Sequence, residues 1–251
     1  MSDGANRLSA PDISGFSPAN DAILLDVDGT ILDIAPTPEA VHVPPSLKQT
    51  LLHLQEETAG ATALVSGREL AVLDRLFAPL TLAAVGCHGA EWRPHPHDAI
   101  EMRSPPLSAE IREAFLAAVA REPQVRVEDK GYTLAFHYRS APERGPDLEA
   151  RLIRCLEPFS PGLRLLHGKL VLEVKARGFD KGEAIRLLMH GVPFAGRRPV
   201  FLGDDITDED AFAVVRELGG IGISVGRSMT DAQSMLPDPA AARAWLAALV
   251  S

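Results

Sequence analysis

Short apolar runs alternate with amphipathic stretches in the first and last parts of the chain. The apolar runs are residues 22–25, 61–65, 82–85, 199–202 and 221–225. Such short runs, each closed by small or polar residues, are typical of strands buried on both faces of a sheet. The intervening amphipathic stretches predict helices that end near Thr58, Phe77, His190, Leu218 and Leu249. This alternation of strand and helix predicts the α/β class, with a parallel sheet.

The pattern changes in the middle of the chain. Here the sequence predicts two helices, at 108–121 and 146–156, and four strands, at 125–128, 132–138, 163–166 and 170–174. The short turns Lys130-Gly131 and His167-Gly168-Lys169 predict that the strands pair as two hairpins. We therefore expect a smaller antiparallel α+β domain at 105–176, inserted into a core made of residues 1–104 and 177–251.

Two of the core strands end in clustered carboxylates. Asp26 and Asp28 follow the first run, and residues i and i+2 of an extended chain share a face, so both project from the carboxyl end of the strand. Gly29 lets the chain turn away sharply behind them. Asp204 and Asp205 follow the run at 199–202 in the same way. Open α/β sheets bind ligands at this edge, so these acids mark a candidate active site.

The carboxylate clusters predict a magnesium site. Mg²⁺ prefers a few carboxylates together with water and substrate phosphate as ligands. A calcium loop fails on spacing, because it needs Gly at its sixth position and Glu at its twelfth. Counted from Asp26 these positions hold Ile31 and Thr37, and counted from Asp204 the sixth is Glu209.

A carboxylate beside a metal ion can attack phosphorus and form an aspartyl-phosphate. Asp26 is the candidate nucleophile, and Asp28 is the candidate acid that protonates the leaving alcohol and then the base that activates water. Ser66 and Lys181 would donate hydrogen bonds to the phosphoryl oxygens. Lys181 opens a predicted helix, where a cation is disfavoured, and a bound phosphate would resolve that conflict. The alternative is that Asp26 and Asp28 only cap a turn.

Two serines fit the capping-box pattern, in which Ser and a Glu or Gln three residues later cap the start of a helix. Ser46 with Gln49 predicts that the first helix opens at Ser46. Ser66 with Glu69 fits equally well, so capping competes with phosphate binding as the explanation of Ser66. Part of the acidity at 208–210 would also suit a helix N-terminus.

Composition narrows the class of protein. The 251 residues are 46% hydrophobic, enough for a substantial core, and the formal net charge of −9 argues against a nucleic-acid or anionic-membrane surface. The two cysteines, Cys87 and Cys155, form no disulfide framework or zinc pattern. The polar first residues do not resemble a signal peptide, and no apolar run is long enough to span a membrane. We expect a cytoplasmic monomer with a loose N-terminal tail.

The ordered motifs resemble those of a known group of enzymes. DVDGT, the serine of VSGR, the lysine of DKG and the GDD of FLGDDITDED resemble the four motifs of the haloacid dehalogenase superfamily of phosphohydrolases. The stretches LLDVDGTILDIAPTPEAV, GCHGAEW, VEDKGYTLAFHYR and LEVKARGFDKGEAI resemble the trehalose-6-phosphate phosphatase family within it. The resemblance runs from about Ile23 to Val215, and we see no departure at the catalytic positions.

The resemblance implies a Rossmann-like core with a mobile cap domain inserted between the second and third motifs. It implies an enzyme of trehalose biosynthesis, a phosphoric monoester hydrolase that releases phosphate from trehalose 6-phosphate. The implied Mg²⁺ ligands are Asp26, the backbone carbonyl of Asp28, and Asp204, with Asp205 nearby or bridging through water. Asp208 would support this acidic site.

Sugar recognition would involve both domains. The candidate contacts are Arg68, Lys130 and Glu173, followed by His88 and Glu91, although His88 equally fits a structural histidine. Three alternatives stay open: a related phosphatase acting on sucrose phosphate or mannosyl-phosphoglycerate, a mutase that transfers the phosphoryl group to a second sugar, and a catalytically silent sugar-phosphate sensor. A sensor has no need of a nucleophile, so the intact acids favour an enzyme.

Overall fold

The computed structural model describes residues 11–35 and 40–250. Residues 1–10, which belong to the predicted loose tail, and residues 36–39 lie outside the described residues. The larger of two sheets has eight strands in the order β12-β11-β10-β1-β2-β3-β4-β5. Its strands are β1 (Asp21–Leu25), β2 (Thr62–Val65), β3 (Ala83–Gly86), β4 (Glu91–Arg93), β5 (Glu101–Met102), β10 (Arg198–Gly203), β11 (Ile221–Val225) and β12 (Ser234–Leu236). The six strands from β12 to β3 are parallel, and β4 and β5 extend the sheet antiparallel.

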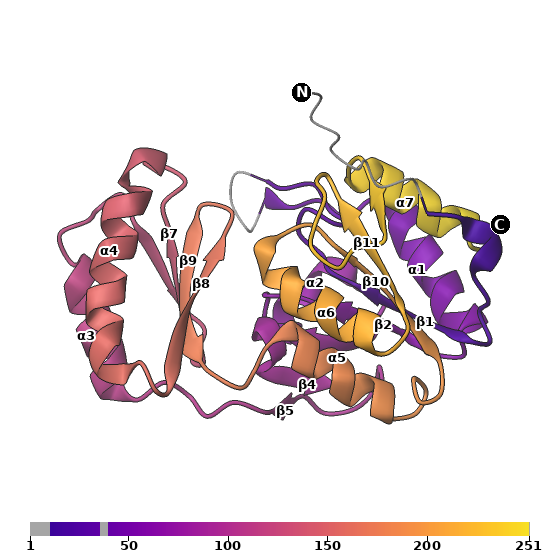
Figure 1. The fold of residues 1–251 in the computed structure, drawn as a ribbon, viewed down its shortest axis with the longest axis horizontal. Coiled ribbons are helices and arrows are strands. Elements are labelled where there is room, and N and C mark those ends of the chain that lie inside the picture. Colours follow the sequence, from indigo (N-terminus) through magenta and orange to yellow (C-terminus); the bar gives the residue numbers. More distant parts are fainter. Residues whose placement is uncertain (1–10, 36–39, 251) are drawn as a thin grey trace, which may run out of the picture.

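Helices cover both faces of this sheet, as the buried strands require (Figure 1). One hydrophobic cluster packs α1, α2 and α7 against one face, and a second packs α5 and α6 against the other. The helices are α1 (Pro45–Glu57), α2 (Leu70–Phe77), α5 (Lys181–His190), α6 (Glu209–Glu217) and α7 (Pro239–Ala248). No helix in the described ranges is long and apolar enough to cross a membrane.

The smaller sheet is antiparallel and lies beside the larger one (Figure 1). Its strand order is β6-β7-β9-β8, and a third hydrophobic cluster packs one of its faces against two helices. The elements are α3 (Ala109–Val119), β6 (Arg126–Asp129), β7 (Thr133–His137), α4 (Gly145–Leu156), β8 (Leu163–Gly168) and β9 (Val171–Ala176). Helices α3 and α4 lie on the side away from the larger sheet, so the uncovered face of the small sheet is turned toward it (Figure 1). We call this unit the cap.

The α/β class with a smaller antiparallel sheet is confirmed, and two details of the prediction are different. Strands β4, β5 and β12 were not predicted, because they are two or three residues long and lack an apolar run. The capping box at Ser46 is wrong, since α1 begins at Pro45 after Pro44 and has no side-chain cap. Pro suits the first helical turn, where the missing N–H costs nothing.

The turn after β1 brings the two acidic strand ends together. Strand β10 pairs directly with β1, and the backbone N–H of Asp26 continues this ladder by donating to the carbonyl of Leu202 at 2.9 Å. Gly29 has φ of +87°, and a Cβ there would lie 2.1 Å from Oδ2 of Asp204. Only glycine fits this position, both for its left-handed backbone and for the close approach of Asp204.

Candidate active site

Lys181 lies between two buried carboxylates. Its Nζ is 2.6 Å from Oδ1 of Asp26 and 2.6 Å from Oδ1 of Asp208, and the Lys181 side chain is 3% exposed. Burial alone would lower the pKa of Lys181, but Asp208 and Asp26 raise it above its usual value, so the side chain stays charged. Burial raises the pKa of Asp26 to about 6, with Asp208 and Asp28 adding to the effect and Lys181 opposing it. The two carboxylates therefore explain how a cation can stand at the start of a helix, since they are its counterions.

Asp204 completes an acidic cluster with Asp26 and Asp208. One carboxylate oxygen of each lies within 4.8 Å of the others. Oδ1 of Asp204 accepts from the hydroxyl of Thr30 at 3.2 Å, and Thr30 also contacts Oδ2 of Asp26 at 2.9 Å. Burial and the neighbouring Asp26 and Asp208 raise the pKa of Asp204 to about 8, because the charged groups nearest to it are mainly negative. An all-oxygen donor set of this kind fits a hard divalent cation.

Asp208 and Asp205 have contacts of their own. Oδ2 of Asp208 accepts from the backbone N–H groups of Asp204 and Asp205, both at 3.0 Å, so Asp208 holds the loop after β10 in shape. The Asp205 carboxylate accepts from the N–H of Ile206 and approaches Arg227. Asp205, predicted as a metal ligand, therefore lies beside the cluster rather than in it. One acid of the stretch 208–210 does have a capping role, because Asp208 forms a capping box with Asp205 for the 3-10 turn Ile206–Asp208.

Asp28 pairs with Arg68 at the mouth of the same site. Nε and Nη2 of Arg68 lie 2.6 Å from Oδ2 and Oδ1 of Asp28, which is a bidentate arrangement. Ser66 is 1% exposed, and its hydroxyl accepts from the backbone N–H of Arg68 at 3.1 Å. Ser66 does not cap a helix, because α2 begins at Leu70 and its N-cap residue is Glu69, whose side chain makes no capping hydrogen bond.

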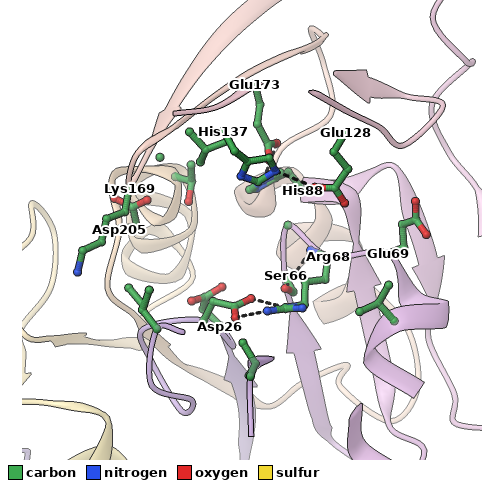
Figure 2. A pocket seen from close by; sticks show the side chains of 18 of the residues that line it. Asp26, Ser66, Arg68, Glu69, His88, Glu128, His137, Lys169, Glu173 and Asp205 are labelled. Atoms are coloured by element: carbon green, nitrogen blue, oxygen red, sulfur yellow. Dashed lines mark hydrogen bonds and ion pairs between the residues drawn. The ribbon is translucent and has the colours of Figure 1, made fainter. Parts of the chain in front are cut away.

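These groups open into a cavity of about 590 Å³ between the core and the cap. That volume is within the range of small-molecule sites. In Figure 2, Asp26, Ser66 and Arg68 lie on the core side, and Glu128, His137 and Glu173 lie opposite them on the cap. The cap residues Arg139 and Lys169 also line the cavity. Sequence reasoning had singled out none of Glu128, His137, Arg139 and Lys169 as site residues.

Glu173 is paired with residues from both domains. Its Oε1 is 3.2 Å from Nζ of Lys130, and its Oε2 is 3.0 Å from Nε2 of His88. Burial would raise the pKa of Glu173, but Lys130 and His88 lower it below the usual range, so the carboxylate is ionised. Burial lowers the pKa of His88. A second cap pair joins Glu128 to His137, whose Nε2 is 2.8 Å from Oε2 of Glu128.

Glu91 is the one predicted sugar contact outside the cavity lining. Its side chain is buried, and Oε2 accepts from the backbone N–H of Leu70 at 2.6 Å. This contact supplies the start of α2 with the cap that its own sequence lacks. We therefore assign Glu91 a structural role.

A parallel sheet with a carboxylate, a lysine and a second carboxylate at its carboxyl edge, under a separate cap, defines the haloacid dehalogenase class of phosphohydrolases. Residues 24–239 match the family model described as trehalose-phosphatase. The chain is 41% identical over 233 residues to a probable trehalose-phosphate phosphatase of Sinorhizobium fredii, covering 92% of this chain and 88% of the relative. It is 39% identical over 233 residues to the trehalose-6-phosphate phosphatase of Escherichia coli, covering 90% and 85%. The chain belongs to the trehalose-phosphatase family.

Solved structures give the same fold. The C-terminal domain of Candida albicans trehalose-6-phosphate phosphatase superposes with a TM-score of 0.81 at 21% identity, covering 98% of this chain and 99% of that one; at this identity the likeness concerns the fold alone. The Aspergillus fumigatus trehalose-6-phosphate phosphatase gives a TM-score of 0.67 at 26% identity, covering 97% and 98%. Membership of a phosphatase family, together with the acidic cluster, indicates a site for a divalent metal ion.

Proposed function

We propose that this protein hydrolyses trehalose 6-phosphate to trehalose and phosphate, with Mg²⁺ as the metal ion and an aspartyl-phosphate as the intermediate. The observation that carries the proposal is the position of Asp26: a buried carboxylate just after β1, 2.6 Å from the Lys181 ammonium and lining a cavity between the core and the cap. Membership of the trehalose-phosphatase family supports the substrate. The substrate is a small sugar phosphate, and no nucleic-acid partner is expected; a cytoplasmic monomer stays our prediction.

Asp26 acts as the nucleophile. A carboxylate oxygen attacks phosphorus, the bond between phosphorus and the C6 oxygen of the sugar breaks, and the phosphoryl group is left on Asp26. Thr30 and Lys181 each hold one carboxylate oxygen of Asp26, at 2.9 and 2.6 Å, which fixes the direction of attack. Lys181 and Ser66 would donate to the phosphoryl oxygens, which carry the developing charge.

Asp28 transfers the protons. It gives a proton to the departing sugar oxygen, and it then takes a proton from the water that attacks the phosphorus of the intermediate. That second attack breaks the bond between phosphorus and Asp26 and releases phosphate, so one water is consumed in each cycle. The bidentate pair with Arg68 is that of the ionised Asp28, the form that takes the proton from water. When Asp28 carries the proton for the sugar oxygen, one of the two Arg68 contacts opens and the other keeps the carboxyl group oriented.

Asp26, Asp204 and the backbone carbonyl of Asp28 would hold Mg²⁺, with Asp205 contributing through water. The oxygen-only donors support a hard divalent cation such as Mg²⁺. When bound, the ion neutralises the repulsion between the Asp26 carboxylate and the substrate phosphate. Asp208 keeps the Asp204 loop in place through its two backbone hydrogen bonds.

The cap recognises the sugar. The cavity wall opposite Asp26 carries charged and polar groups that suit sugar hydroxyls, and these are Glu128, His137, Arg139, Lys169 and Glu173. Arg139 also donates to the carbonyl of Ala35 at 2.6 Å, so it links the cap to the core at the rim of the cavity. A disaccharide between the domains would touch both.

The test is phosphate release by the purified protein from a panel of sugar phosphates, with Mg²⁺ and with a chelator. The panel includes trehalose 6-phosphate, sucrose phosphate and mannosyl-phosphoglycerate, and product analysis separates hydrolysis from transfer to a second sugar. We expect trehalose 6-phosphate to give the highest kcat/KM, only with the metal. A clear preference for another member would overturn the substrate. Asp26→Asn should lower kcat by at least about 10³-fold, and unchanged release would overturn the mechanism and favour a sensor.

A further inference from the structure

The segment 66–68 has three successive backbone carbonyls, and each accepts a hydrogen bond from a different residue. The carbonyl of Ser66 accepts from the N–H of His88 at 3.0 Å, and that of Arg68 accepts from the N–H of Cys87 at 2.9 Å. The middle carbonyl, of Gly67, accepts from Nζ of Lys130 at 3.0 Å. The outer two donors are backbone groups of the core, whereas the middle donor is a side chain of the cap.

We infer that Lys130 is a positioning residue that couples the placement of the cap to the geometry of the segment 66–68. This inference rests on the proposed phosphatase function and deepens it. Lys130 then acts on the phosphate site through Gly67, in addition to any contact with sugar.

The segment matters because both of its side chains belong to the reaction. Ser66 lines the cavity, and its hydroxyl, the proposed phosphate donor, accepts from the N–H of Arg68. Arg68 in turn holds Asp28 by its two hydrogen bonds. A shift of the Gly67 peptide therefore moves the phosphate donor and the partner of the acid–base residue together. Rates of enzymes are sensitive to such shifts, because reacting groups must be held within a fraction of an ångström.

The Gly67 peptide is held from both sides. A Cβ on Gly67 would lie 2.4 Å from Nε2 of His88, so the His88 ring packs directly against this glycine. Lys130 approaches the carbonyl of the same residue. His88 in turn is fixed by the cap, because its carbonyl accepts from Nζ of Lys175 at 2.8 Å and its ring contacts Glu173. The cap thus contacts the segment through Lys130 directly and through His88 indirectly.

Lys130 is well suited to this role. Its side chain is 7% exposed, and although burial alone would lower its pKa, Glu173 and Glu128 raise the pKa above its usual value, so it remains charged. An ammonium group has three donors, and Gly67 and Glu173 take two of them, which leaves one for a substrate hydroxyl. Removing Nζ would leave the Gly67 carbonyl without its charged donor.

The experiment compares Lys130→Gln with the wild type on two substrates, trehalose 6-phosphate and p-nitrophenyl phosphate. The second substrate has no sugar for the cap to bind. If Lys130 positions the segment 66–68, the variant loses kcat by about tenfold on both substrates. Lys130→Arg, which keeps the charge, should recover part of the loss. Lys48→Gln is the matched control, because Nζ of Lys48 also donates to a backbone carbonyl, that of Ala78, on the surface of the core.

A second measurement does not depend on activity. Hydrogen–deuterium exchange of peptides covering residues 66–70 should be about tenfold faster in Lys130→Gln than in the wild type or in Lys48→Gln. Lys130→Met replaces Lys130→Gln if the latter does not fold.

Two results would overturn the inference. One is a raised KM for trehalose 6-phosphate alone, with kcat/KM for p-nitrophenyl phosphate within about twofold of the wild type; the other is unchanged exchange over 66–70. If the wild type hydrolyses p-nitrophenyl phosphate and not trehalose 6-phosphate, the proposed substrate fails, while the comparison of variants on p-nitrophenyl phosphate still decides the role of Lys130.

Discussion

Arg68 and Asp28 form a bidentate ion pair, with Nε 2.6 Å from Oδ2 and Nη2 2.6 Å from Oδ1. The Arg68 side chain is 13% exposed, and that of Asp28 is 35% exposed, so the pair lies at the opening of the cavity with the arginine on the inner side. A planar fork fixes the orientation of a carboxylate as well as its charge. Arg68 was predicted from the sequence as a sugar contact, and the structure gives it the candidate acid–base residue as its partner.

Arg68→Lys should lower kcat by roughly 10- to 100-fold and change KM for trehalose 6-phosphate by less than about threefold. Lysine keeps the charge and loses the two-point grip on Asp28. Steady-state kinetics of phosphate release measure both constants. Arg103→Lys is the control, since Arg103 is a partly exposed arginine outside the cavity lining. A raised KM with kcat unchanged would instead support the predicted sugar contact.

Glu91→Ala should destabilise the protein without affecting its activity. The substitution removes the acceptor from the backbone N–H of Leu70 at the start of α2, and loss of a helix cap costs about 0.5–2 kcal/mol. Urea unfolding measures the free energy of unfolding, and kcat and KM should stay within about twofold of the wild type. Glu91→Gln, which keeps an acceptor oxygen, should lose less stability. A tenfold rise in KM with unchanged stability would show instead that Glu91 acts in sugar binding, as the sequence predicted.

The core half of the site could be predicted because its chemistry follows the strand pattern. Asp26 comes directly after one apolar run and Asp204 follows another after a single glycine, and the carboxyl ends of parallel strands meet at one edge. Lys181 stood out because it conflicted with the helix dipole. Asp208 was harder to assign, since the same acid that suits a helix start also holds Lys181 and the Asp204 backbone, and those contacts are tertiary.

In the cap, Lys130 and Glu173 were predicted as sugar contacts, whereas Glu128 and His137 were missed, although their signal was present. Along β6, β7 and β9 the apolar residues pack against α3 and α4, and the alternate positions carry Glu128, His137 and Glu173. Glu128 and Glu173 both stand opposite Ala135, so the two carboxylates flank a small residue on one row of the sheet. Alternation shows which positions share a face. It does not show that this face is covered by another domain, so it gave no reason to select Glu128 or His137.

Lys175 should make stability depend on pH in the alkaline range. It is 2% exposed, and burial lowers its pKa from 10.5 to about 8, with Arg164 acting in the same direction. The unfolded state therefore binds more protons than the folded state between these values, and the contribution of Lys175 to stability rises with pH through this window and is lost as pH falls through about 8. The shift corresponds to roughly 3 kcal/mol.

Urea unfolding of the wild type and Lys175→Gln at pH 7, 8, 9 and 10 checks this expectation. The difference in the free energy of unfolding between the two proteins should change in favour of the wild type as pH rises. Taking the difference cancels the titration of the other groups. A difference that stays constant from pH 7 to pH 10 would show that Lys175 keeps an ordinary pKa in the folded protein.

Asp208→Asn should weaken the metal site without removing a direct ligand. Oδ1 of Asp208 accepts from Lys181 at 2.6 Å, and Oδ2 accepts from the N–H groups of Asp204 and Asp205. An asparagine has one acceptor oxygen and one donor NH₂, so one of these two sides loses its acceptor. Mutation of a residue that orients metal ligands typically weakens metal affinity by about 10- to 100-fold. We expect the Mg²⁺ concentration for half-maximal activity to rise by about that factor.

The measurement is phosphate release as a function of Mg²⁺, after removal of bound metal with a chelator, for wild type, Asp208→Asn and Asp210→Asn. Asp210 is the matched control, because it is an exposed acid of the same stretch whose carboxylate contacts Arg164 of the cap. The control should keep the Mg²⁺ dependence of the wild type. If Asp208→Asn also keeps it and loses only kcat, Asp208 acts through Lys181, and the shape of the loop after β10 does not depend on its two backbone hydrogen bonds.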